Sequence, residues 1–101
     1  MPLFWTPSAV AAEIERVRST ADTLNREVEA SRAVRGSFRM AWRGFYDEIQ
    51  RWLDSEPSTL SGSNAVVADA YLERLADWRR QFESEGGDSA APYDERRDGM
   101  P

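Results

Sequence analysis

The stretch MAWRGFYDEIQRW, residues 40–52, holds two tryptophans, a phenylalanine and a tyrosine. Its large apolar side chains recur every three or four residues, which is the period of one face of an α-helix. We interpret Trp42, Phe45 and Trp52 as core residues of a small helical fold. Burial of each ring then contributes roughly 2 to 3 kcal/mol to folding.

The same spacing continues upstream through most of the N-terminal half. Ser31 and Arg35 are its only polar members, and the register resumes in phase beyond Gly36. Because two helices joined by a loop have no reason to keep phase, this register predicts one continuous helix over residues 7–54. Gly36 and Gly44 each weaken that helix by roughly 1 kcal/mol relative to alanine. Its 3.5-residue period is typical of coiled-coil packing. The apolar members are Val10, Ile14, Val17, Ala21, Leu24, Val28, Phe38, Trp42, Phe45, Ile49 and Trp52.

Turn-forming residues mark the other boundaries. Residues 55–64, with Pro57 and Gly62 among Ser, Thr and Asn, predict a connecting loop. A second apolar stripe predicts a shorter helix over residues 65–85, capped by Asn64 and stopped by Gly86-Gly87. We therefore predict an all-α fold, with one helical-hairpin domain over residues 1–85 and a flexible C-terminal tail over 86–101.

In the predicted hairpin the shorter helix folds back antiparallel on the C-terminal half of the long one. A symmetric loop then sets only apolar residues opposite one another. The expected pairs are Val67 with Trp52, Tyr71 with Ile49, Leu75 with Phe45, Trp78 with Trp42, and Phe82 with Phe38.

The N-terminal stripe has no partner in this arrangement, because a helix of about 20 residues spans only ~30 Å. We therefore expect it to bind copies of the same chain or a larger complex. Three large apolar residues before Thr6 extend this expectation, either as a plug for a neighbour's pocket or as a staple on their own helix. The predicted partner interface is Leu3, Phe4, Trp5, Val10, Ile14, Val17, Ala21, Leu24 and Val28.

Trp42-Arg43-Gly44, near the middle of a chain of 101 residues, resembles the signature of the WxG family. These are small helical hairpins exported by type VII secretion systems. The resemblance implies a turn at Trp42-Arg43-Gly44 and dimerisation into a four-helix bundle. The sequence departs from the family in two ways: the helical register runs through these residues, and Tyr71 and Tyr93 lack an acidic residue four positions later.

Four arginines recur at helical spacing where acidic residues are absent: Arg32, Arg35, Arg39 and Arg43. One interpretation is a clamp for phosphates or an acidic partner, because guanidinium groups bind such anions through paired donors. The alternative is pairing within the hairpin with the acidic row Asp69, Glu73 and Asp77. Those carboxylates are also the only candidate metal cluster, and a solvated face is the simpler interpretation.

Composition excludes several kinds of function. The chain has no Cys and no His, so a thiolate nucleophile, a Cys-based metal site and a histidine base are absent. Its net charge of −5 argues against a generally nucleic-acid-binding surface. We expect no cofactor, no membrane span and no signal peptide, and hence a chain that is cytoplasmic at synthesis, with incorporation into a particle or non-classical secretion left open.

These observations favour a non-enzymatic structural or assembly protein, such as a virion or secretion-apparatus component, that associates through its N-terminal helix. Binding of nucleic acid or an acidic partner through the arginines, and a secreted WxG-type hairpin, are the alternatives.

Overall fold

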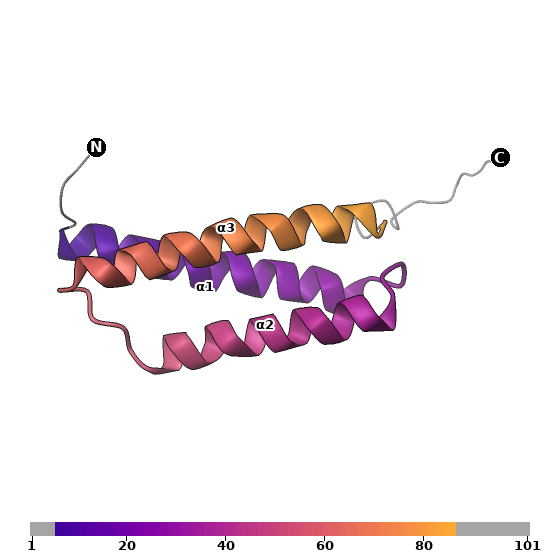
Figure 1. Ribbon diagram of the computed structural model, residues 1–101, viewed down its shortest axis with the longest axis horizontal. Helices are drawn as coiled ribbons and strands as arrows, with labels where there is room; N and C mark the ends of the chain where they lie inside the picture. Colours follow the sequence, from indigo (N-terminus) through magenta and orange to yellow (C-terminus); the bar gives the residue numbers. More distant parts are fainter. Residues whose placement is uncertain (1–5, 87–101) are drawn as a thin grey trace.

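The computed structural model describes residues 6–86, and this part of the chain contains three helices and no strand. The helices are α1 (Pro7–Ala30), α2 (Gly36–Asp54) and α3 (Gly62–Ser84). They lie side by side, with α1 and α3 running in one direction and α2 in the other (Figure 1). The predicted all-α fold class is confirmed. Leu3, Phe4, Trp5 and the predicted tail after Gly86 lie outside the described residues.

The prediction of one continuous helix over residues 7–54 is wrong, because the chain turns at residues 31–35. Ser31 leaves the helical conformation at ψ 137°, and its Oγ accepts a hydrogen bond from the Ala33 N–H. Such a local side-chain bond offers the backbone an alternative to the helix. Val34, only 7% exposed, anchors the turn in the core. Both polar members of the register, Ser31 and Arg35, lie at the two ends of this turn. They therefore mark the boundary between two helices and not two polar positions within one helix.

The turn brings the N-terminal stripe into the protein's own core. Val10, Val17 and Val28 have no exposed surface, and the other stripe residues of α1 are also buried. The prediction that they await an external partner is therefore wrong for the described residues of that set. The prediction assumed a long straight helix, whereas the reversal of the chain lets α2 and α3 cover α1. The residues of the predicted partner interface that belong to the core instead are Val10, Ile14, Val17, Ala21, Leu24 and Val28.

Several local predictions are confirmed. Thr6 caps α1 by accepting a hydrogen bond from the Ala9 N–H at 3.1 Å, with Pro7 in the first turn. Gly86, at φ 87°, follows the end of α3 in the left-handed conformation that glycine adopts readily.

The predicted cap of the last helix is wrong. Asn64 does not cap α3, which begins earlier at Gly62; the Asn64 side chain donates to the Ser58 carbonyl instead.

A layer of aromatic rings fills the space between α2 and α3. Trp42 packs edge-on against Trp78 with centroids 5.7 Å apart, and Phe38 stacks on Phe82 at 6.4 Å, as the hairpin register predicted. Trp52 meets Tyr71 at 5.3 Å rather than Val67. The helices α1 and α3 approach more closely, because buried alanines face the core where bulkier side chains would separate them. These are Ala21, Ala65 and Ala68.

Candidate partner-binding surface

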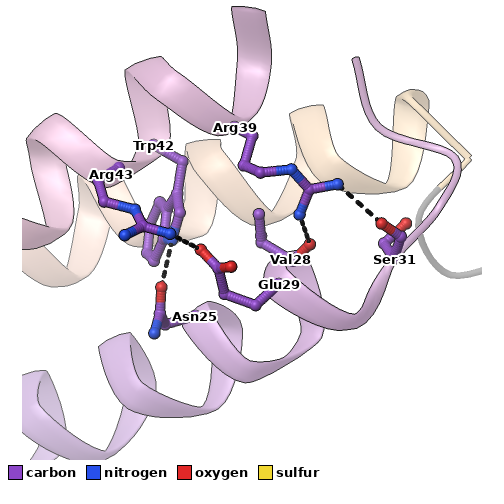
Figure 2. A network of polar contacts seen from close by, with 7 residues as sticks. All are labelled: Asn25, Val28, Glu29, Ser31, Arg39, Trp42 and Arg43. Atoms are coloured by element: carbon purple, nitrogen blue, oxygen red, sulfur yellow. Dashed lines mark hydrogen bonds and ion pairs between the residues drawn. The ribbon is translucent and has the colours of Figure 1, made fainter. Parts of the chain in front are cut away.

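Trp42-Arg43-Gly44 lies within α2, and its three residues have three different surroundings. Trp42 is fully buried, and its Nε1–H donates to Asn25 Oδ1 on α1 at 2.9 Å (Figure 2). Its ring also contacts Trp78 on α3. Arg43 forms an ion pair with Glu29. Gly44 is exposed, and nothing lies within 4 Å of the position a Cβ would take. The tryptophan therefore joins all three helices, the arginine joins two, and the glycine faces outward.

Arg39 binds the carboxyl end of α1. Its Nη1 donates to the Val28 carbonyl at 2.5 Å and its Nη2 to the Ser31 carbonyl at 2.8 Å (Figure 2). The last carbonyl groups of a helix lack helical partners and carry partial negative charge, so a guanidinium placed there stabilises the helix end. Arg39 thus fixes the place where α1 stops.

A second guanidinium closes the same end of the bundle. Arg35, directly before α2, donates to both carboxylate oxygens of Glu85 at the end of α3, at 3.3 and 2.9 Å. The hydrogen bonds from Arg35 lower the pKa of Glu85 below its usual value. This contact joins residues fifty positions apart in the sequence, at an exposed site where it specifies register more than it adds stability.

The four-arginine stripe is therefore mostly engaged within the protein. Three of its guanidinium groups bind Glu85, the end of α1 and Glu29, and Arg32 is exposed. The predicted pairing with the acidic row is wrong for these three arginines, which have the other partners just named. Asp77 of that row pairs with Arg80. The described residues contain no group of acidic side chains placed to hold a metal ion, Asp69, Glu73 and Asp77 included.

Further polar contacts cross the helix interfaces. Arg79 on α3 donates hydrogen bonds to both carboxylate oxygens of Glu27 on α1, at 2.6 and 3.1 Å, and these bonds lower the pKa of Glu27. Tyr46 donates to Asp22 Oδ1 at 2.7 Å; burial, followed by this bond, raises the pKa of Tyr46 to about 12. These bonds fix the orientation of each helix about its own axis, because a helix rotated about that axis would lose its hydrogen-bond partner.

The α2–α3 interface carries its own polar contacts. Tyr71 donates to Glu48 Oε2 at 3.2 Å, and burial raises the pKa of this tyrosine. Arg74 lies 3.4 Å from the same carboxylate and stacks over the Phe45 ring at 4.3 Å. The Nε2 of Gln50 is the one buried side-chain nitrogen or oxygen without a hydrogen-bond partner in the described part of the chain.

The outer face of α2 remains uncovered by the other described helices. Met40 on this face is 77% exposed, and it lines an open depression of about 300 Å³ together with Arg39 and Arg43. Its exposed neighbours Ala41 and Gly44 have small side chains or none. We define Ser37, Met40, Ala41 and Gly44 as the Met40 face.

Sequence reasoning missed the Met40 face as a candidate site. Met40 lies outside the apolar register, since it falls between Phe38 and Trp42 rather than on their spacing. An apolar residue off the register, next to small residues and flanked by arginines, was the available signal.

No protein-family model, curated protein or solved structure matches the chain. The two connections lie at residues 31–35 and 55–61, while Trp42-Arg43-Gly44 lies inside a helix rather than in the turn that the WxG resemblance implies. Among residues 6–86 no helix is both long and apolar enough to cross a membrane.

Proposed function

We propose that this protein is a non-enzymatic assembly protein that associates with a second copy of itself through the Met40 face of α2. The proposal rests on the exposed position of Gly44 within α2. Glycine inside a helix costs roughly 1 kcal/mol relative to alanine, and the surroundings of Gly44 leave full room for a Cβ. The fold of one chain therefore gains nothing from glycine here. A helix of another molecule, approaching closely over this position, supplies a reason for it.

Charge favours a second copy with α2 in antiparallel orientation. Arg39 and Arg43 are the charged residues in the first half of the helix, from Gly36 to Gly44; Arg39 is held by the carbonyls at the end of α1, and Arg43 is the exposed one. The second half carries three carboxylates against the single cation Arg51; Glu48 contacts Tyr71 and Arg74 on α3, and Asp47 and Asp54 are exposed. A two-fold axis near Gly44 sets the basic half of each helix against the acidic half of the other, as an isologous interface requires.

Exposure of Met40 provides the apolar contact at the centre of this interface. Methionine adapts its shape to a partner, and its side chain is already outside the core. One helix face on another buries less than the roughly 1,200 to 2,000 Å² of a stable interface, so the expected dimer is weak and dependent on concentration.

Sedimentation equilibrium and native mass spectrometry of the intact chain test the proposal. We expect a monomer–dimer equilibrium in the micromolar to millimolar range. Gly44→Leu places a large side chain at the contact and should leave a folded monomer, whereas Gly44→Ala should raise the melting temperature of the monomer and weaken the dimer only modestly.

Arg16 provides the matched surface control. It is exposed on α1, where it pairs with Glu13 of the same helix, so Arg16→Leu adds a comparable apolar side chain to a helix other than α2. This variant should dimerise like the parent. A parent chain that stays monomeric, or a Gly44→Leu variant that dimerises equally well, would contradict the proposal.

A further inference from the structure

The connection between α1 and α2 keeps the two helices in one helical register. The buried stripes of α1 and α2 share a spacing of three and four positions, and Ser31 and Arg35 occupy the two places of this spacing that fall in the connection. Val34, buried in the turn, lies three residues after Ser31 and four before Phe38, which is the same side of a helix. If residues 31–35 became helical, α1 and α2 would therefore form one helix with one continuous stripe.

The backbone of this connection is compatible with a helix. It contains no glycine or proline, and among residues 6–86 a positive φ occurs only at Glu56 and Gly86, which lie outside it. Arginine and alanine, which supply three of its five residues, are good helix formers. The connection over residues 55–61 differs, because Glu56 is left-handed at φ 56° and Pro57 follows it. The first connection can therefore convert to a helix, whereas the second is held as a turn.

Arg39 occupies the carbonyl groups that a continuous helix would use. In such a helix the Val28 carbonyl accepts from the Arg32 N–H. The Ser31 carbonyl likewise accepts from the Arg35 N–H. In the structure the Arg39 guanidinium donates to these two carbonyls instead, at 2.5 and 2.8 Å (Figure 2). Because both hydrogen bonds require the carbonyls to be free of helical partners, they stabilise the turn against the continuous helix.

We propose that two copies of this chain exchange their α1 helices, and that Arg39 opposes the exchange by holding residues 31–35 as a turn. In the exchanged dimer each chain has one helix over residues 7–54, and its α1 part packs on α2 and α3 of the other copy. The core contacts of the bundle then re-form between chains, so the surface that α1 leaves fits a second copy. This association is independent of the Met40 face, which stays on the outside of the bundle.

The exchanged arrangement also avoids a conflict of charge at its centre. The two long helices run antiparallel about a two-fold axis near Ala33. Ser31 of each copy then lies opposite Arg35 of the other, so the stripe contains no pair of like charges where the helices cross.

Refolding at high protein concentration tests the proposal in a Gly44→Leu background, which removes association through the Met40 face. The intact chains are unfolded in denaturant, refolded and then separated by size after dilution. Arg39→Met should raise the association constant about a hundredfold, because each of two chains loses charge-assisted hydrogen bonds that contribute roughly tenfold. Arg32→Met is the matched control, since it changes an exposed arginine of the same connection, and it should leave the constant unchanged.

Two further variants change the connection itself. Ser31→Ala removes the acceptor of the Ala33 N–H and favours helix, so it should increase the dimer without altering Arg39. Arg32→Pro should abolish the dimer when combined with Arg39→Met, because proline interrupts a continuous helix. The turn accepts this proline, since Ser31 is already extended at ψ 137°, as the residue before a proline prefers.

An intrachain distance identifies the exchanged form. The chain has no cysteine, so Ser19→Cys and Asp47→Cys, at exposed positions of α1 and α2, place one pair of spin labels on it. Labelled chains are mixed with an excess of unlabelled chains before refolding, so that the measured distance lies within one chain. In a continuous helix these residues are roughly 42 Å apart, at 1.5 Å for each of the 28 positions between them. In the three-helix form they lie on neighbouring helices, whose axes are about 8 to 10 Å apart.

The dimer of the Arg39→Met chain should show the long distance and its monomer the short one. A dimer with only the short distance would overturn the proposal, and so would Arg39→Met and Ser31→Ala chains that refold without additional dimer. Either result leaves the Met40 face standing, because that interface is judged from the parent chain with Gly44.

Discussion

At the end where α1 passes into α2, charged groups and a buried valine close the bundle; at the opposite end, apolar side chains are exposed. The closed end has the Arg35–Glu85 contact, the Arg39 cap on α1 and the buried Val34. The open end has Leu60 and its neighbours. Contacts at the closed end define where the chain reverses, so the topology is set there. The exposed side chains of the open end take no part in these contacts.

The largest effect of a single substitution is expected at Trp42, in the core between the two ends. Trp42→Ala removes a fully buried ring and its hydrogen bond to Asn25, and it should lower the free energy of unfolding by about 3 to 5 kcal/mol. Trp52→Ala, at a half-buried ring nearer the open end, should cost less. Chemical denaturation measures both. Equal losses would remove the distinction between a core common to three helices and a less covered end.

Arg39→Met tests the closed end directly. Methionine keeps much of the apolar stem but leaves the carbonyls of Val28 and Ser31 without this donor, so we expect a loss of about 1.5 to 3 kcal/mol. Arg32→Met, at an exposed arginine in the same turn, should change stability by less than about 0.5 kcal/mol. If the two variants denature alike, Arg39 does not hold the end of α1.

Acid should weaken the carboxylate contacts of the closed half. Folding lowers the pKa of Glu27 and of Glu85 from the ordinary 4.5, so the unfolded chain binds more protons as the pH falls through this range. The stability from these contacts is therefore present above about pH 4.5 and is lost below it. A combined Glu27→Gln and Glu85→Gln variant should show a lower melting temperature near neutral pH and a flatter acid limb. A limb as steep as that of the parent would contradict these assignments.

A small effect of the opposite sign is expected at Gln50, whose buried amide nitrogen has no hydrogen-bond partner among the described residues. Replacing a buried, unsatisfied polar group by an apolar one of similar size removes its desolvation cost. Gln50→Leu should therefore raise the free energy of unfolding by up to about 1 kcal/mol in chemical denaturation. A clear loss of stability would show that the amide makes a stabilising contact through solvent.

Periodicity in the sequence predicted the helical class, the first cap and the ring pairs of Trp42 and Phe38, because these depend on local spacing. It did not predict the reversal at residues 31–35. Two helices that pack on one core each carry a stripe, and here the five-residue connection preserves the phase between the stripes. Local spacing also could not predict the partners of Arg35 and Arg39, because Glu85 and the end of α1 lie close to these arginines only after the chain reverses.

Substitution of Val17 and Leu24 together by Asp tests the central claim, that the N-terminal stripe is the protein's own core. Both side chains are buried within the bundle, and each unpaired buried charge costs several kcal/mol, comparable in sum to the roughly 5 to 15 kcal/mol that stabilise a typical domain. The control places the same charges, at the same seven-residue separation, at the exposed positions Ala12 and Ser19 of α1. Circular dichroism during heating should show cooperative unfolding for the control and none for the Val17→Asp, Leu24→Asp variant. A variant that keeps the helix content and melting transition of the parent would contradict the account.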